Sequence, residues 1–393
     1  MTFAHILCLV LGAVVALAVL GSALETVVLP QEGFPRLAQF VFALVYRLVV
    51  HPQNNRLARS LRRLYAPVAL VSLPLVWMIF MMAAFTSIYW GTHDLSGSKA
   101  FEVSVSSITT MGFSEPNGTG RIWIAFVEAT IGLGLVALLI SYLPTIYGAY
   151  NGREKGTNRL RPLAGSPPNA QEFLQTLVRV GGLETPDIWQ NAADWMLDLE
   201  QTHSAFPILT YFPDSGSEQS WVATMGTVLD ASALVFAASD GDFGGVFADP
   251  EKGPLTVLVY GLPLIVHIAQ AVNIPLPPPA RLPDLMARTG EPPPAISISR
   301  DEYDTAITAL SGILAVEPGH EDEAWRRFAW IRSAYDPALR ALAGITLAAP
   351  ALWTTDRPAR VGEPRFIRRR PLHVDWSKGQ PMTPVGDNVA TGG

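Results

Sequence analysis

Three long apolar runs dominate the first 150 positions of the chain. Residues 2–24 carry no charge apart from the titratable His5, residues 66–90 carry none, and residues 122–150 carry one, on Glu128. Each run exceeds the ~20 residues that an α-helix needs to cross about 30 Å of hydrocarbon. Because lipid offers the backbone no hydrogen-bond partners, each run is predicted to be a membrane-spanning helix.

Beyond residue 170, apolar positions recur at spacings of three and four, the period of helices packed on a core. This pattern predicts helices at residues 171–181, 187–203, 221–239, 254–272, 300–316 and 322–347. Strand-like alternation is nearly absent, so the segments predict an all-α domain of about five to seven helices. The polar residues 151–169 are expected to form a linker before it.

Two of these helices are apolar enough to suggest a second membrane hairpin. Residues 221–239 contain Asp230, and residues 254–272 contain His267. Ionisable side chains at the centre of a lipid-exposed helix are costly. We therefore favour two helices in the domain core over a membrane hairpin.

Positive charge predicts the orientation of the spans. Six arginines lie between the first and second runs: Arg36, Arg47, Arg56, Arg59, Arg62 and Arg63. The next loop carries more acid than base, and basic residues follow the third run. Because positively charged loops stay in the cytoplasm, the sequence predicts a multi-pass protein of the inner (cell) membrane. Its N-terminus is expected outside and its C-terminal domain in the cytoplasm.

These patterns divide the chain into five parts. They are an N-terminal transmembrane helix at 1–24, a basic cytoplasmic or interfacial segment at 25–65, a two-helix module at 66–150, a helical cytoplasmic domain at 151–353 and a disordered tail at 354–393. The first run has an alternative as a cleaved signal peptide, although it lacks a positively charged start. Residues 34–50 form either a helix at the inner membrane surface or a cytoplasmic helix on the later domain.

The loop between the second and third runs predicts a half-length helix. Residues 98–109 can form a helix about 16–18 Å long, which is half the thickness of a bilayer. If it enters from outside, the partial negative charge of its C-terminus points toward the membrane centre and favours a cation there. Residues 110–114 would then return as extended backbone, whose free carbonyls can replace the hydration shell of a cation.

Three residues add to this prediction. The hydroxyl of Thr110 supplies a further oxygen at the inner end of the extended segment. Gly112 permits backbone angles that residues with a Cβ adopt only at a cost. Glu115 would lie at the outer mouth and raise the local concentration of cations. The alternative is an ordinary outer loop whose residues match this pattern by chance.

In this order of elements, the chain resembles the two-transmembrane pore module of potassium channels. That family carries T-V-G-Y-G followed by Asp between its two helices. Thr109 and Thr110 match the paired threonines, Met111 the valine, Gly112 the first glycine, Phe113 the tyrosine and Glu115 the acid. The resemblance covers residues 66–150, with the pore loop (P-loop) at 98–116. It implies a selectivity filter formed by the carbonyls of Thr110, Met111, Gly112 and Phe113, with Thr109 packing behind them.

One position departs from the family's pattern. Ser114 stands at the second filter glycine, so it either strains its backbone or abandons the family's carbonyl geometry at the outermost ion site. Filters of the form T-x-G-F-S also resemble the pore loops of Trk-type potassium uptake proteins, which carry four in one chain. This chain has one, so the resemblance implies a homotetramer. It leaves open whether potassium or sodium is preferred.

Four further positions are candidates for supporting or gating the filter. Glu128 is the only carboxylate within a span, and it either bonds a serine within residues 104–107 or lies near the outer interface. Gly132 and Gly134 fall where the family's pore-lining helix has its hinge glycine. Pro144 either shapes a gate or marks where the helix leaves the membrane.

Composition argues against other classes of site. The single cysteine, Cys8, allows no disulfide within the chain and no cysteine metal cluster. The net charge of −6 indicates no nucleic-acid partner, and no catalytic motif is present, so no enzyme and no metal site are predicted. Residues 240–251 match a calcium loop only in part. The tail contains basic residues that either contact anionic lipid or stay solvated: Arg365, Arg368, Arg369 and Arg370.

The predicted fold is an all-α membrane protein in which an extra N-terminal span precedes a helix, pore helix, filter and helix, followed by an all-α cytoplasmic domain. The predicted function is a tetrameric cation channel that conducts potassium and needs no cofactor beyond that permeant ion. Its expected partners are monovalent cations, the bilayer and its own copies. The alternative is a non-conducting membrane sensor or scaffold that acts through the helical domain.

Overall fold

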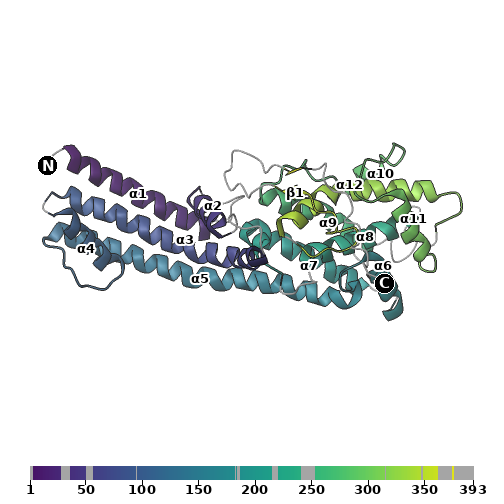
Figure 1. Cartoon of the computed structure of the whole chain (residues 1–393), viewed down its shortest axis with the longest axis horizontal. Coiled ribbons are helices and arrows are strands. Elements are labelled where there is room, and N and C mark those ends of the chain that lie inside the picture. Colours follow the sequence, from purple (N-terminus) through teal and green to yellow (C-terminus); the bar gives the residue numbers. More distant parts are fainter. Residues whose placement is uncertain are drawn as a thin grey trace, which may run out of the picture. The chain divides into compact units, whose positions relative to one another are not determined.

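The computed structural model describes eleven stretches of the chain, separated by gaps (Figure 1). They are residues 3–27, 36–49, 56–93, 95–181, 183, 186–214, 220–239, 253–314, 316–346, 348–361 and 374–375. The chain forms two compact units, of which the first ends at Ala149 and the second begins at Tyr150. We call them the membrane unit and the helical domain. The partly matching calcium loop at 240–251 lies outside the described residues.

The protein is an all-α, multi-pass membrane protein. The membrane unit contains α1 (Phe3–Val27), α2 (Arg36–Val49), α3 (Arg56–Gly91), α4 (Gly97–Ile108) and the first part of α5 (Thr119–Ala164). Five described helices are long and apolar enough to cross a membrane: α1, α3 from Pro67 onward, α5, α8 (Trp221–Ala238) and α9 (Pro254–Ala271). The three predicted spans correspond to α1, α3 and α5. Helix α3 begins at Arg56, ten residues before the start of the predicted span at residue 66.

Helices α1 and α3 pack closely along their length (Figure 1). A Cβ at Gly12 of α1 would lie 2.5 Å from the Ala84 carbonyl oxygen of α3. A Cβ at Gly91 of α3 would lie 2.8 Å from the His5 carbonyl oxygen of α1. Glycines at these two contacts therefore let the backbones of α1 and α3 approach, which is how helices associate in a medium without a hydrophobic driving force.

The short amphipathic helix α2 packs on α3. Ala38, Val41, Phe42 and Val45 recur at spacings of three and four and are buried. The hydroxyl of Tyr65 on α3 donates to the Phe42 carbonyl at 3.3 Å. These four side chains of α2 are therefore covered by protein within the membrane unit, whereas Phe40 and Leu44 stay exposed.

Helix α5 continues for 46 residues, from Thr119 to Ala164. The expected linker at 151–169 is therefore wrong over its first fourteen residues, and α5 does not end at Pro144. The extension is helical because it has a core to pack on: Leu160 and Ala164 are buried in the hydrophobic core of the helical domain. A Cβ at Gly156 would overlap the ring of Trp195, so α5 and α7 are in direct contact there.

The helical domain contains the remaining elements. They are α6 (Ala170–Val180), α7 (Pro186–Ala205), η1 (Pro207–Tyr211), α8, α9, α10 (Leu282–Met286), α11 (Arg300–Ala309), α12 (Glu321–Thr346) and two antiparallel strands, β1 (Arg360–Val361) and β2 (Val374–Asp375). Each of the six predicted helices is present, although the 300–316 segment ends as a helix at Ala309. Thr354 and Thr355 are buried, so ordered chain extends past the predicted boundary at residue 353.

Helix α8 is buried over every residue, by α6, α9 and α12. Its Asp230 is ion-paired with Arg332 of α12, and the hydroxyl of Tyr335 donates to the same carboxylate at 2.6 Å. On α9, the exposed His267 Nδ1 lies 2.5 Å from Glu200 Oε1 of α7. A fully covered α8 and an exposed His–Glu pair on α9 support two helices of the domain core, as the sequence favoured.

Arg153 joins α5 to the loop after η1. Its fully buried guanidinium donates to the carbonyls of Leu209 at 2.9 Å and Pro213 at 3.0 Å, and to Glu154 Oε1 at 3.0 Å. Asp214 Oδ1 lies 3.9 Å from Arg153 Nη2. Burial raises the pKa of Asp214 to about 7, the Arg153 charge opposes this rise, and Glu154 adds to it.

The same cluster affects His203 of α7. Burial, together with the positive charge of Arg153, lowers the pKa of His203 to about 3. His203 is therefore neutral in the folded chain at neutral pH, with its ring packed against Trp221 at a centroid distance of 4.8 Å.

We expect Asp214→Asn to stabilise the full-length chain above about pH 7 and to change its stability little near pH 4. The pKa of Asp214 is raised from 3.8 to about 7 on folding. The folded state therefore loses stability as pH rises between these values and keeps that loss at higher pH, by on the order of 1.4 kcal/mol per unit of pKa.

Thermal unfolding of both proteins in detergent, at several values between about pH 4 and about pH 8, would measure this difference. His203 titrates in both proteins, so its effect cancels. A difference between the two proteins that does not change with pH would contradict the assignment.

Candidate functional site

Helix α4 is a half-length helix that packs on α3. It has 12 residues, so it is about 18 Å long. Ser96 caps it by accepting the Lys99 N–H at 3.3 Å. Ala100, Val103 and Ile108 are buried along one side of the helix. The helix expected at residues 98–109 is therefore present within one residue at each end.

The loop after α4 has an unusual backbone. Thr110 has a φ of 54° and Gly112 a φ of 70°, so two residues in three take left-handed conformations. Such a conformation is uncommon for threonine, and it persists where surrounding contacts hold it. The backbone angle of Gly112 is one that residues with a Cβ adopt only at a cost, as the sequence predicted.

Ser106 of α4 supplies those contacts. Its carbonyl accepts the N–H groups of Met111 at 3.1 Å and Gly112 at 3.4 Å. Its hydroxyl oxygen accepts the N–H of Ser114 at 2.9 Å. The sequence identified Ser106 only as one of several partners for Glu128. The sequence feature that could have identified Ser106 is the group of serines among apolar residues on this helix.

These hydrogen bonds determine where the carbonyls of the loop point. In a trans peptide the C=O of one residue is directed opposite to the N–H of the next, and these peptides are trans. The N–H groups of Met111, Gly112 and Ser114 point at Ser106, so the carbonyls of Thr110, Met111 and Phe113 point away from α4. They accept no hydrogen bond from any described residue.

The side chains of the loop divide into exposed and buried sets. Met111 is 71% exposed and Phe113 is 59% exposed. Glu115 is also exposed. Ser114 is buried, and its hydroxyl has no hydrogen-bond partner among the described residues. Large apolar side chains exposed in this loop indicate a surface that another molecule covers.

The paired threonines bond locally. Thr109 is exposed, and its hydroxyl donates to the Val105 carbonyl of α4 at 2.5 Å. The Thr110 hydroxyl donates to the Thr109 carbonyl at 2.7 Å. Thr109 thus extends the hydrogen bonding of α4 by its side chain and does not pack behind the loop within this chain.

Glu128 of α5 contacts α4 from the opposite side. It is fully buried, and its Oε1 lies 2.6 Å from the Ser104 hydroxyl, which also lies 3.0 Å from the Met82 carbonyl of α3. A serine hydroxyl has one proton to donate. Both contacts are hydrogen bonds when a protonated Glu128 donates to Ser104 and Ser104 donates to Met82.

A neutral Glu128 also fits its surroundings. The structure describes no basic side chain bonded to it, and an unpaired ionised carboxylate in an apolar interior is very costly. Its Oε2 and the hydroxyl of the buried Tyr89 on α3 have no hydrogen-bond partner among the described residues. Of the two interpretations from the sequence, the geometry matches the contact with α4.

Gly132 and Gly134 differ in their surroundings. A Cβ at Gly132 would lie 2.3 Å from the Ile108 carbonyl oxygen, at the C-terminal end of α4. A Cβ at Gly134 would have no atom within 4 Å. Gly132 therefore allows α5 to approach α4, which is a packing role that the sequence did not predict. Pro144 lies three turns further along α5 and is not part of this contact.

Arg121 is a second residue that the sequence analysis did not place. It lies at the start of α5, where its Nε donates to Thr92 Oγ1 at 3.1 Å and its Nη1 to the Asn117 carbonyl at 3.0 Å. These bonds connect the returning end of the loop with the end of α3.

Among the described residues, no group of three or more His, Cys, Asp or Glu side chains is placed to hold a metal ion. No protein-family model, curated protein or solved structure matches the chain. The site is therefore interpreted from its own geometry.

We expect Glu128→Gln to keep the stability of the wild type and Glu128→Ala to lose about 1–3 kcal/mol. Glutamine keeps a neutral side chain that can bond Ser104, whereas alanine leaves Ser104 without this partner and opens a void. Thermal unfolding of the full-length chain in detergent measures both variants. A Gln variant as unstable as the Ala variant would show that Glu128 acts as a charge.

Gly132→Ala should lower the melting temperature, by an amount that corresponds to about 1–3 kcal/mol, because its methyl group overlaps the Ile108 carbonyl. Gly134→Ala is the matched control, two residues further along the same helix. Because alanine has a higher helix propensity than glycine, this change should leave stability unchanged or slightly raised. Equal losses in the two variants would show that the contact between Gly132 and Ile108 is not the cause.

Proposed function

We propose that this protein is a membrane cation channel formed by four copies of the chain, in which the carbonyls of Thr110, Met111 and Phe113 line the path of the ion. The observation that supports this most directly is the direction of these carbonyls, away from α4 and without a bond to any described donor. Carbonyl oxygens presented together in this way replace the hydration shell of a cation. Potassium is the cation that the resemblance of the loop favours.

The electrostatics of α4 and the loop agree with a cation. The C-terminal end of a helix carries a partial negative charge, and α4 ends at Ile108, next to the carbonyl-lined segment. The exposed carboxylate of Glu115 follows the loop and attracts cations toward it. No basic side chain occurs from Thr109 to Gly120.

Assembly of four copies accounts for the exposed apolar surface. One loop surrounds no ion, whereas several loops around a symmetry axis do. Met111 and Phe113 are exposed beside the carbonyls, and α5 has further large apolar side chains exposed to solvent: Ile122, Trp123, Phe126, Val127, Leu133, Val136 and Ile140. Copies packed around the axis and lipid outside them would cover these side chains.

In this proposal the N-terminus lies outside an inner (cell) membrane and the helical domain lies in the cytoplasm, as the arginine distribution predicts. In this proposal α5, which is one helix from Thr119 to Ala164, lines the pore with its first part. Gly134, which has free space around it, and Pro144 are the positions where α5 would bend.

The second candidate function is a non-conducting membrane sensor or scaffold. Ser114 supports it, because a buried serine stands where the channel family has its second filter glycine. In this case the loop is structural, and the helical domain binds the partner.

Gly112→Asp should abolish potassium flux into liposomes that contain the purified protein. The change adds charge and bulk at a position with a φ of 70° in the carbonyl-lined segment. Gly118→Asp is the matched control. Gly118 has a φ of 92° in the same loop, and a Cβ at either position meets no atom within 4 Å.

Flux that is lost only in Gly112→Asp supports the proposed path, and the sodium rate of the wild type measures the selectivity that Ser114 leaves. Equal loss in both variants would mean that folding, not the path, was disturbed. Wild-type protein that shows neither flux nor fourfold symmetry in particle images would favour the scaffold.

A further inference from the structure

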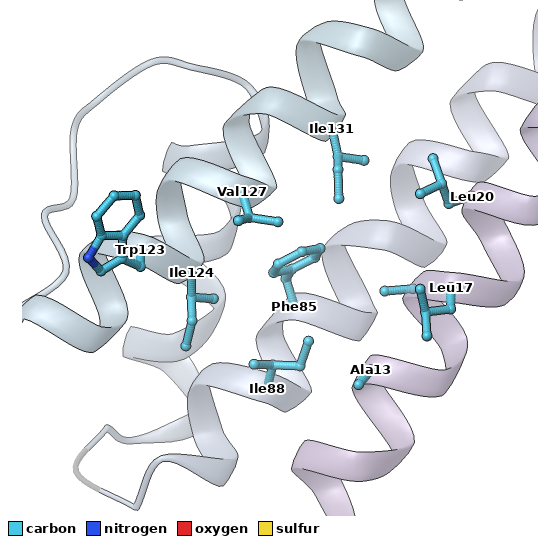
Figure 2. A pocket seen from close by; sticks show the side chains of 10 residues that line it. Ala13, Leu17, Leu20, Phe85, Ile88, Trp123, Ile124, Val127 and Ile131 are labelled. Carbon is cyan, nitrogen blue, oxygen red and sulfur yellow. The ribbon is translucent and has the colours of Figure 1, made fainter.

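An apolar groove lies within the membrane unit, between three helices. Figure 2 shows side chains of α1, α3 and α5 that converge on one space. Its volume is about 440 Å³. The lining residues are Ala13, Ala16, Leu17, Leu20, Phe85, Ile88, Trp123, Ile124, Val127 and Ile131.

The chemistry of the walls limits what the groove can hold. All the lining side chains are hydrocarbon except the indole of Trp123, so an ion or a polar solute would lose its hydration without gaining partners. Spaces with purely apolar walls bind apolar molecules in preference to water. The occupant is therefore a hydrocarbon group.

The groove results from uneven packing of the three helices. Glycines bring α1 and α3 into close contact, as described above, whereas α5 does not approach either of them as closely over the described residues. Ala13 and Ala16 are small side chains on the α1 wall. An empty groove would deprive its walls of dispersion contacts along about two helical turns.

The surroundings indicate the source of the hydrocarbon. All three helices are long and apolar enough to cross a membrane. Leu17 is 70% exposed, Trp123 is 65% exposed and Val127 is 47% exposed, so the groove opens sideways. Helix α1 has large apolar side chains exposed along most of its length: Phe3, Ile6, Leu7, Val10, Leu11, Val14 and Leu17. The wall formed by α1 is thus continuous with a surface that faces lipid.

We propose that the groove between α1, α3 and α5 binds one acyl chain of a membrane phospholipid. The acyl chain fills the space that Ala13 and Ala16 leave open and joins α5 to the α1–α3 pair. A second copy of the chain is the other source of hydrocarbon. It is less suited, because α1 carries the extended lipid-facing surface and forms one wall. The proposal depends on membrane insertion and not on ion conduction.

A photoreactive diazirine analogue of leucine at position 17 tests the proposal in the full-length chain. The protein is placed in vesicles of phosphatidylcholine and phosphatidylglycerol and then washed with lipid-free detergent. After irradiation, its mass is measured by mass spectrometry. We expect a phospholipid adduct at position 17 that survives the wash. The same analogue at Leu11, which is exposed on α1 outside the groove, should lose its adduct.

Filling the groove provides a second readout. Ala13→Phe should lower the adduct at position 17 about tenfold, because a phenyl ring occupies the site of the acyl chain. Val14→Phe, at the neighbouring exposed position outside the groove, should leave it unchanged.

Three results would overturn the proposal. The first is an adduct at position 17 that washes away as readily as the one at position 11. The second is an equal effect of the two phenylalanine variants. The third is a crosslink to another chain in place of a lipid adduct. The last result would assign the groove to a second copy. The comparison of positions 17 and 11 needs no packing variant, so it remains decisive if Ala13→Phe fails to fold.

Discussion

The geometry of the loop between α4 and α5 depends on one residue, Ser106. Its carbonyl and its hydroxyl oxygen together accept three backbone N–H groups of the loop. Each bond fixes the orientation of a peptide plane, and each plane turns the preceding carbonyl away from α4. A serine can do this at a buried position because its hydroxyl is short and close to the backbone. The carbonyl-lined path that we propose rests on this arrangement.

The helices behind the loop are joined by polar contacts that lie among apolar side chains. Glu128 and Ser104 join α5 to α4, and the same hydroxyl reaches α3 through the Met82 carbonyl. Gly132 brings the backbone of α5 against the end of α4. A buried polar group without partners is costly in a protein interior and in lipid. Breaking one of these contacts therefore disturbs three helices.

In the helical domain, apolar helices form a protein core. Helix α8 is long and apolar enough to cross a membrane, yet protein surrounds every residue of it. Asp230 is tolerated there because Arg332 and Tyr335 satisfy it. Arg153 has a related role on the extension of α5, where its guanidinium donates to the Leu209 carbonyl of η1 and to the Pro213 carbonyl of the loop after it. Buried charges that are paired and hydrogen-bonded connect helices that are distant in sequence.

The sequence by itself determined the elements whose signals are local. The three apolar runs, the half-length helix before Thr109 and the six helices of the domain follow from span length and from spacings of three and four. Gly112 was identified from its own conformational freedom, and its φ of 70° agrees. In contrast, the expected linker after residue 150 is helical, because Leu160 and Ala164 find a core that no local pattern displays.

Tertiary structure alone decided which distant residues meet. The contact between Ser104 and Glu128 spans 24 positions, and the pair of Arg332 with Asp230 spans 102. It also decided that Gly132 packs against Ile108. Lipid and protein interiors select the same apolar side chains, so the sequence could favour a buried α8 only from the cost of placing Asp230 in lipid. The neighbouring helix α12 supplies the Arg332 and Tyr335 partners that satisfy this carboxylate.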